Sequence, residues 1–335
     1  MNDGSVLIIN EREITSILAG REQEVMQTIE LAYLAHHNQQ STLPHSSFLT
    51  FPDSNINRII ALPAYLGEGF DTAGIKWISS FPGNREFGMN RASAVIILNS
   101  MTTGRANAVM EGSVISAKRT AASAVIAAQR LSRPQTSHRI GFIGCGLINL
   151  EVLRFLVAAY PSIKSIALYD HTAERAEQFV SACQDLLPNS DITVCTNSDV
   201  VLAEADIVSF ATTAVHPHIQ RLPARPKGQV ILHVSLRDLS PEIILEADNI
   251  VDDVDHVCRA NTSIHLAEQL AKNRSFIRGT IADIITGQVP AKSDQDNVTI
   301  FSPFGLGVLD LALATVVHAR AHELGLGITV ESFFG

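Results

Sequence analysis

The sequence predicts an α/β fold, with a parallel sheet in the middle of the chain and an α+β part formed by its two ends. Between residues 140 and 251, short apolar segments alternate with amphipathic ones, as parallel strands alternate with helices. Before residue 110, apolar segments are instead separated by Gly, Pro and Asn turns. A chain of 335 residues is also long enough for two cores.

The N-terminal part is predicted to contain strands and one long Ala-rich helix. The strands are expected at 58–63, 72–78 and 92–98, and the helix at 112–131. The polar, Pro-containing stretch 132–137 reads as a linker. A last helix, about 308–323, is expected to return to the first domain. The predicted domains are therefore 1–131 with 308–335, and 132–307.

The middle of the chain reads as repeated β-α-β units. Strands are expected at 140–143, 166–170, 192–195, 206–210, 229–234 and 249–251, and helices at 147–157, 172–187 and 198–205. Ligands of such sheets bind beyond the carboxyl ends of the strands. That rule singles out the residues that follow the fourth and fifth strands, namely Thr212, Thr213, Ser235, Leu236 and Asp238.

A glycine turn follows the first of these strands. Gly144 and Gly146 permit a tight turn and a close approach of the backbone to a pyrophosphate. The N–H groups of Leu147 and Ile148 open the next helix, where they would bind the phosphates. Asn149 replaces the third glycine of the usual motif. The turn predicts a Rossmann-type nucleotide domain inserted into a discontinuous α+β domain.

Asp170 ends the second predicted strand, close to the spacing of about 20 residues at which an acid meets the ribose. A carboxylate there accepts hydrogen bonds from the ribose 2′-OH and repels a 2′-phosphate. The predicted cofactor is therefore NAD rather than NADP. The alternative is that Asp170 caps the following helix.

Composition excludes several classes of function. The net charge of −9 lacks the basic character that nucleic-acid binding requires. No long apolar run predicts a membrane span, and the N-terminus shows no signal peptide. The four scattered cysteines suggest a reducing, cytoplasmic setting rather than a disulfide framework or a zinc site, and no metal is expected.

These segments together resemble the ornithine cyclodeaminase/μ-crystallin family over nearly the whole chain. The matching stretches are 74–76, 119–122, 144–146, 169–170, 235–238, 301–307 and 324–327. The resemblance implies that the split domain binds an amino-acid substrate and forms a homodimer, and that the chemistry passes through an imine generated with NAD. Two positions that the family uses for ornithine do not match its pattern, because Ser46 and Ile60 stand where an arginine and a glutamate are expected.

By position in the family pattern, Lys76 and Arg119 look like the pair that binds the substrate α-carboxylate, and Asp238 like the acid that meets the reacting nitrogen. Asp238 and Lys76 are the candidates for handling the proton. The stretches 58–63, 74–80, 90–99, 109–111 and 143–148 resemble the branch that oxidises N-(2-amino-2-carboxyethyl)-L-glutamate to 2-oxoglutarate and L-2,3-diaminopropionate, a precursor of siderophores and peptide antibiotics. In that branch Arg58 and Arg91 would bind further carboxylates.

The charges support an anionic substrate independently of the resemblance. Four cations, Arg58, Lys76, Arg91 and Arg119, suit a substrate with three carboxylates, whereas a cationic substrate needs an acid.

Each candidate also has a structural alternative. Lys76 could be a charge on an edge strand, Arg119, Arg58 and Arg91 could lie on solvated surfaces, and Asp238 could cap the helix that starts near Ser240. His318 and His322 have the spacing of metal ligands on a helix, but no third ligand is evident. A different amino-acid or imine dehydrogenase, a cyclodeaminase and a non-catalytic binding protein remain alternatives for the function.

Overall fold

The computed structural model describes residues 4–133, 138–160, 162–292 and 297–335. It divides the chain into two compact units, one comprising residues 1–119 and 306–335 and the other residues 120–305. Helix α3 (Ser113–Leu131) begins in the first unit and continues into the second. The boundary that we predicted after residue 131 falls at the end of this helix, and residues 134–137 of the predicted linker lie outside the described residues.

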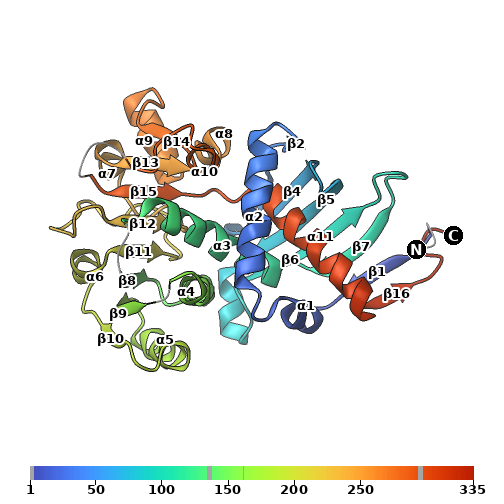
Figure 1. Cartoon of the computed structure of the whole chain (residues 1–335), viewed down its shortest axis with the longest axis horizontal. Coiled ribbons are helices and arrows are strands. Elements are labelled where there is room, and N and C mark those ends of the chain that lie inside the picture. Colours follow the sequence, from blue (N-terminus) through green and yellow to red (C-terminus); the bar gives the residue numbers. More distant parts are fainter. Residues whose placement is uncertain (1–3, 134–137, 161, 293–296) are drawn as a thin grey trace. The chain divides into compact units, whose positions relative to one another are not determined.

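The first unit is built on a mixed sheet with the order β16-β1-β7-β6-β5-β4-β2, and β3 pairs with β4 (Figure 1). Its strands are β1 (Val6–Ile9), β2 (Ser41–Thr42), β3 (Ser47–Phe51), β4 (Ser54–Leu66), β5 (Thr72–Ser80), β6 (Ala92–Asn99), β7 (Ala106–Glu111) and β16 (Ile328–Val330). Its helices are α1 (Glu11–Leu18), α2 (Glu22–His37), a 3₁₀ turn (Pro82–Phe87) and α11 (Gly307–Leu324).

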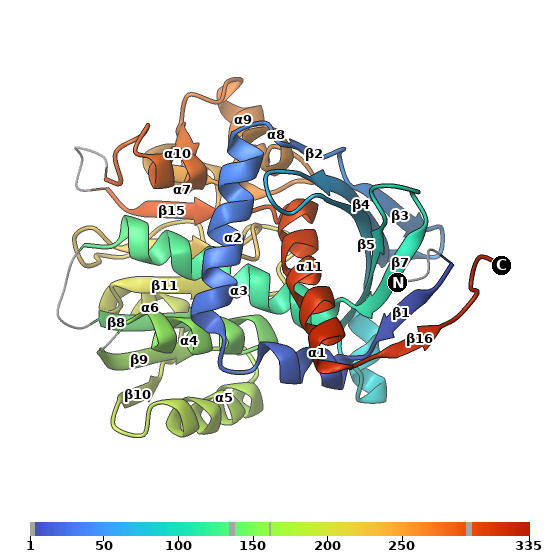
Figure 2. The same ribbon diagram turned by 45° about the vertical axis from the view of Figure 1, so that its right-hand side comes forward.

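Helix α11 packs on one face of this sheet. It contacts β4, β5 and β6 on one side and α1 and α2 on the other, so it lies between the sheet and the two N-terminal helices (Figure 2). The first part of this helix, residues 307–314, is buried all round, which explains its run of Val, Leu and Ala. Asp310 is the exception in this run, and it is completely buried.

The second unit contains a sheet with the order β10-β9-β8-β11-β12-β15-β13-β14 in which every pairing is parallel. Its strands are β8 (His138–Ile143), β9 (Ile163–Tyr169), β10 (Asp191–Val194), β11 (Ile207–Phe210), β12 (Val230–His233), β13 (Asp248–Val251), β14 (Ile277–Thr280) and β15 (Thr299–Ser302). Its helices are α4 (Leu147–Ala159), α5 (Ala173–Leu186), α6 (Ser198–Glu204), α7 (Pro241–Glu246), α8 (Val254–Val257), α9 (Ser263–Ala271) and α10 (Ile281–Thr286).

Helices cover both faces of this parallel sheet, as its apolar strands require. Successive residues of β8 point to opposite faces. Phe142 stacks on Phe179 of α5 with ring centroids 5.3 Å apart. On the other face, a Cβ at Gly141 would lie 2.7 Å from a methyl group of Val201 in α6, so only glycine permits this close approach.

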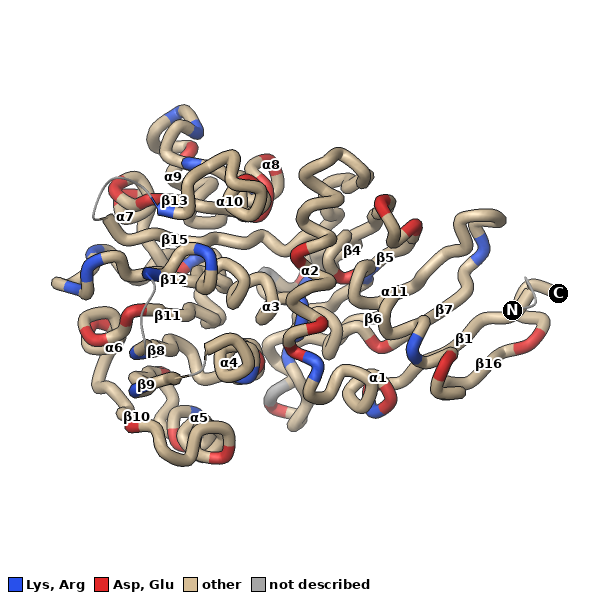
Figure 3. Tube along the Cα trace, in the orientation of Figure 1, with Lys and Arg blue, Asp and Glu red and all other residues tan. Residues whose placement is uncertain are grey.

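The α/β class predicted from the sequence is confirmed, and all six predicted strands of the middle region are present within a few residues. The first five strands have the spatial order 3-2-1-4-5 of a Rossmann fold. The sequence analysis missed the short or irregular elements, among them β1, β3, β7, β14 and β16. Acidic and basic residues are interspersed along both units (Figure 3).

Candidate active site

The strand order of the second unit reverses between β8 and β11, which is where ligands of such sheets bind. The loops that leave β8, β11 and β12 lie side by side at this point. The backbone N–H of Ala211 donates to the carbonyl of Ile143 over 3.0 Å, and that of Ser235 donates to the carbonyl of Phe210 over 3.0 Å. The candidate residues after all three strands are therefore brought together at one edge of the sheet.

The glycine turn after β8 has the geometry that a pyrophosphate needs. Gly144 has φ 90°, and a Cβ there would lie 2.6 Å from the carbonyl oxygen of Ala211. Gly146 is the N-cap of α4, and a Cβ at Gly146 would meet no atom within 4 Å. No side chain caps the first turn of α4, to which Leu147 and Ile148 belong. The turn therefore presents backbone N–H groups toward open space, where they fit a dinucleotide phosphate.

Asn149, in place of the third glycine, has a structural function that the motif did not reveal. Its side-chain amide donates to the carbonyl oxygens of Ile143, Gly144 and Ser209, at 3.2, 2.6 and 3.3 Å. The Ser209 hydroxyl donates back to its Oδ1 over 2.7 Å. This buried network ties the start of α4 to the ends of β8 and β11, and so holds the glycine turn in place.

Asp170 lies at the end of β9, as predicted, and its carboxylate also organises the glycine turn. Oδ2 accepts the backbone N–H of Cys145 over 2.8 Å, and Oδ1 accepts that of Thr172 over 2.9 Å. Thr172, not Asp170, is the N-cap of α5, so the capping alternative is wrong. Each carboxylate oxygen has two lone pairs, so Asp170 retains acceptor capacity for ribose hydroxyls. Burial raises the pKa of the neighbouring Cys145 thiol to about 12, which leaves it without thiolate character.

Asp238 lies in the loop after β12, fully buried and surrounded by donors. The hydroxyls of Thr212 and Ser235 donate to its two oxygens, and His218 Nε2 lies 3.1 Å from Oδ1. Burial alone would raise the pKa of this carboxyl, but the hydrogen bonds from His218 and Ser235 and the nearby His233 ring outweigh burial and hold the pKa well below its ordinary value. Asp238 is therefore an ionised carboxylate whose charge is stabilised by hydrogen bonds from the protein instead of by water.

The loop that carries Asp238 is locally strained. Leu236 has φ 67°, a conformation that costs a non-glycine residue on the order of 1 kcal/mol, and strain of this kind gathers at functional sites. Its carbonyl is held by the backbone N–H of Ser263 over 2.7 Å. The N-cap of α7 is Ser240, whose hydroxyl accepts from Ile243, so the alternative of Asp238 as that cap is wrong. Thr213, also predicted for the cofactor, is exposed.

The first unit contains a buried cluster of charges. Lys76 Nζ lies 2.5 Å from Oδ2 of Asp310 and 3.2 Å from the Ser116 hydroxyl, and Arg119 Nε lies 3.0 Å from Oδ1 of Asp310. All three charged side chains are buried. Strand β5 runs between β4 and β6, so Lys76 is not on an edge strand, and the solvated-surface alternative for Arg119 is wrong as well.

Two cations share one carboxylate in this cluster, so its three charged side chains carry two positive charges and one negative charge. Burial lowers the pKa of Lys76 to about 8, Asp310 opposes that shift, and Arg119 adds to it. For Asp310, burial alone would raise the pKa, but Arg119 and Lys76 reverse the shift and hold it below its ordinary value. Sequence reasoning missed Asp310, which is 234 residues from Lys76.

Arg58 and Arg91 meet around Ser80, at one end of β5. Arg58 is the cross-strand partner of Ser80, and Arg91 Nη1 donates to the Ser80 hydroxyl over 2.6 Å. The Nε of Arg58 is buried and has no hydrogen-bond partner among the described residues. Residues 76 and 80 lie two pleats apart, about 13 Å, on the same face of the sheet. The structure therefore brings Arg58, Arg91 and the Lys76 cluster to one face of the first unit.

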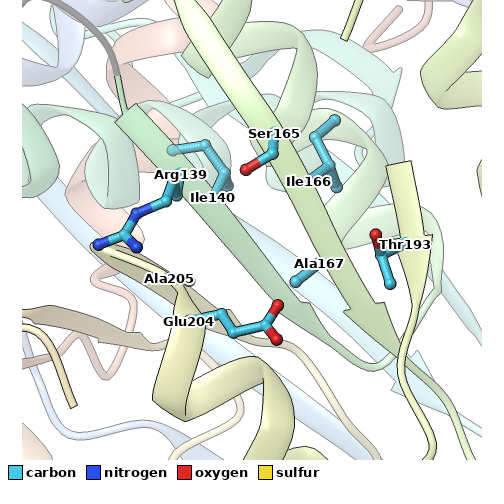
Figure 4. Close-up of a pocket in the computed structure, with 8 residues that line it drawn as sticks. All are labelled: Arg139, Ile140, Ser165, Ile166, Ala167, Thr193, Glu204 and Ala205. Carbon is cyan, nitrogen blue, oxygen red and sulfur yellow. The ribbon is translucent and has the colours of Figure 1, made fainter. Parts of the chain in front are cut away.

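A cavity of about 150 Å³ lies elsewhere in the second unit and contains none of the predicted site residues. It is lined by Arg139, Ile140, Ser165, Ile166, Ala167, Thr193, Glu204 and Ala205 (Figure 4). Arg139 binds Asp206 with its Nη2 at 2.8 Å from Oδ1, near the start of β8. The cavity is thus remote from the carboxyl ends of the strands, where the candidate residues gather.

Within the described ranges, no three His, Cys, Asp or Glu side chains gather in a way that could hold a metal ion. His318 and His322 contact each other, with ring centroids 5.7 Å apart. No helix of the described chain is both long and apolar enough to cross a bilayer.

The strand order and glycine turn place the second unit in the class of dinucleotide-binding domains. The chain belongs to the ornithine cyclodeaminase/mu-crystallin family, which it matches over residues 15–325, and this confirms the predicted family. It is 29% identical to N-((2S)-2-amino-2-carboxyethyl)-L-glutamate dehydrogenase of Staphylococcus aureus, over 98% of this chain and 99% of the relative.

Two further relatives concern alanine dehydrogenases. The alanine dehydrogenase of Archaeoglobus fulgidus is 28% identical over 98% of both chains. The solved structure of an archaeal alanine dehydrogenase dimer with bound NAD superposes with a TM-score of 0.86 at 27% identity, covering 98% of this chain and 99% of that one. The likeness extends through both units of the chain.

Proposed function

We propose that this chain is an NAD-dependent oxidoreductase that acts on a CH–NH bond. Its substrate is N-(2-amino-2-carboxyethyl)-L-glutamate, and its products are 2-oxoglutarate and L-2,3-diaminopropionate. The balanced reaction consumes NAD and water, moves a hydride from the glutamate Cα to NAD, and releases NADH and a proton with the two products. Diaminopropionate made in this way would serve siderophore or peptide antibiotic synthesis.

The observation that carries the substrate is the positive face of the first unit. The cluster of Lys76, Arg119 and Asp310 contains two cations and one carboxylate. Arg58 adds a guanidinium with a buried Nε that lacks a partner among the described residues, and Arg91 adds another beside Ser80. A substrate with three carboxylates offsets these charges, whereas alanine brings one carboxylate and ornithine a cation.

The second unit would hold the cofactor. The N–H groups at the start of α4, with Leu147 and Ile148, fit the pyrophosphate between Gly144 and Gly146. Asp170 would accept from the ribose hydroxyls and so select NAD. Thr212, Thr213, Ser235 and Leu236 surround the position of the nicotinamide in this proposal, and bound NAD supplies the hydride acceptor.

We also propose that two copies of the chain associate through the outer face of the mixed sheet. On the face opposite to Lys76 and α11, Trp77 pairs with Val95, and Ile8 pairs with Ile328. These four side chains are 43, 42, 40 and 66% exposed, in the same order. An apolar sheet face of this kind marks an interface, and the archaeal relative is described as a dimer. The four buried free cysteines fit a reducing cytoplasm.

The experiment is a substrate comparison with purified protein. NADH formation is followed with N-(2-amino-2-carboxyethyl)-L-glutamate, L-alanine, L-proline and L-ornithine, and the products are identified by mass spectrometry. We expect turnover with the first compound and equal amounts of 2-oxoglutarate and L-2,3-diaminopropionate. Turnover confined to alanine or proline would assign a different dehydrogenase, and tight binding without turnover would assign a binding protein.

A further inference from the structure

We propose that His218 is the residue that accepts the substrate proton and that Asp238 positions it. His218 lies in the loop between β11 and β12, outside every sequence motif considered above. Its Nε2 is 3.1 Å from Oδ1 of Asp238, and its side chain is 46% exposed, whereas that of Asp238 is fully buried. An exposed imidazole backed by a buried carboxylate is the arrangement in which acids orient catalytic histidines.

The backbone fixes the two residues to each other. The N–H groups of His218 and Ile219 both donate to the carbonyl of Asp238, each over 2.9 Å. The N–H of Ser240 donates back to the carbonyl of Ile219 over 2.9 Å, and Ile219 forms a parallel bridge with Leu239. Backbone hydrogen bonds therefore join the segment that carries His218 to the segment that carries Asp238, so the imidazole is held in one orientation.

The hydrogen bonds assign the tautomer of the histidine. An ionised carboxylate only accepts, so the contact to Asp238 requires a proton on His218 Nε2. In the neutral ring Nδ1 then carries a lone pair, and Nδ1 has no hydrogen-bond partner among the described residues. Asp238 itself is a poor proton acceptor, because its two oxygens already receive hydrogen bonds from Thr212, Ser235 and His218.

This step rests on the proposed amine oxidation. The proton passes from the protonated secondary amine to His218 Nδ1, which gives an imidazolium and a neutral amine. The neutral nitrogen then has the lone pair that C=N formation requires, bound NAD would supply the hydride acceptor, and water would complete the hydrolysis. The buried negative charge of Asp238 stabilises the imidazolium that has formed. This stabilisation helps His218 to act as a general base toward the protonated amine of the substrate.

The charged groups around the pair are few. Asp238 faces His218 directly, and His233 lies behind Asp238, with its Nε2 accepting the backbone N–H of Asp238 over 3.1 Å. Arg237, the next charge along that loop, is turned to the carbonyl of Ala260 over 2.7 Å. His216 and Arg221 occupy the same loop as His218. Among these groups only the carboxylate of Asp238 contacts the imidazole of His218.

The test has one arm that needs no cofactor. Side-chain ¹H–¹⁵N spectra of the NAD-free protein are recorded against pH, and His218→Gln assigns the signals of this ring. We expect the proton on Nε2, and in Asp238→Asn we expect the ¹⁵N shifts of this ring to change, because the carboxylate that accepts from Nε2 is gone. A proton on Nδ1 in the wild-type protein, or ring signals that Asp238→Asn leaves unchanged, would overturn the pairing.

The second arm is the pH profile of kcat and KM with the proposed substrate. We expect His218→Gln to lower kcat on the order of 10²–10⁴-fold, with KM nearly constant, and to abolish the acid limb of the profile. His216→Gln, two residues away and exposed, is the matched control and should leave both unchanged. Retention of kcat and of the acid limb in His218→Gln would overturn the proposal. If the wild type does not turn over this substrate, the proposed function fails, and the spectra alone decide the pairing.

Discussion

Replacing Asp310 by asparagine should destabilise the first unit more than any other single charge removal in the buried cluster. The Asp310 carboxylate is fully buried and uses both oxygens, one for Lys76 at 2.5 Å and one for Arg119 at 3.0 Å. Asparagine preserves the shape and one acceptor oxygen but removes the negative charge. Two buried cations would then lose the carboxylate that they share, which is the costly way to break a buried ion pair.

The size of this destabilisation depends on which of the two cations can lose its proton. Lys76 can release its proton in the variant, because its pKa of about 8 in the wild type already includes the raising effect of Asp310, and loss of that carboxylate lowers the pKa further. Arg119 cannot lose its proton, so it carries most of the penalty. We therefore expect a loss of about 3–5 kcal/mol in the free energy of unfolding. Thermal unfolding of this unit should begin on the order of 6–20 °C lower.

The assay is urea unfolding at pH 7, compared for the wild type, Asp310→Asn and a surface control. Asp255→Asn is a suitable control, because Asp255 also pairs with an arginine, at 2.6 Å from Arg274, but its side chain is 72% exposed. The control should change the free energy of unfolding by less than about 1 kcal/mol. A loss below 1 kcal/mol in Asp310→Asn would refute the reasoning, because it would mean that the cluster does not hold two unscreened cations.

Three further predictions test the other parts of the site. NAD should be used in preference to NADP in steady-state kinetics, and equal efficiency with both would count against Asp170 as the ribose acceptor. Arg119→Ala should raise KM and cost about 2–4 kcal/mol in kcat/KM, while calorimetry shows unchanged NAD affinity; a collapse of NAD binding would exclude its assignment to the substrate. The folded pKa of Lys76, about 8, lies below its ordinary 10.5, so the unfolded chain binds the extra proton between these values and stability should rise with pH in that window. Unfolding at pH 8 and pH 10 should show this rise in the wild type relative to Lys76→Met, and identical slopes would disprove it.

The parts of the fold that could be predicted from sequence are those encoded locally. The strand before Gly144 is an uninterrupted apolar run, the turn needs a positive φ at Gly144, and Asp170 follows at the spacing that the β-α-β unit imposes. Strands β1 and β16 were missed because each is only a few residues long; they pair with each other, and β1 also pairs with β7. Strands β1 and β16 lie near opposite ends of the given sequence, so no local pattern could reveal their pairing.

The residues of the candidate site also differ in whether a local sequence pattern could reveal them. Lys76, Arg119 and Asp238 could be selected because a motif or a strand end marked them. Asp310 sits in an apolar helix with no motif, and its function depends on two side chains far away in the sequence. His218 is likewise one of several loop histidines until the structure places its Nε2 against Asp238.

The two residues that sequence analysis missed, Asp310 and His218, both belong to a pair in which a buried carboxylate contacts a basic side chain. In each case a buried carboxylate determines what a neighbouring cationic or basic group can do. Asp310 raises the pKa of Lys76 against the effect of burial and binds Arg119 with its other oxygen. Asp238 keeps one proton on the outer histidine and so directs its free lone pair outward. Substituting Asp310 should therefore lower the pKa of Lys76, whereas substituting Asp238 should change which nitrogen of His218 carries the proton.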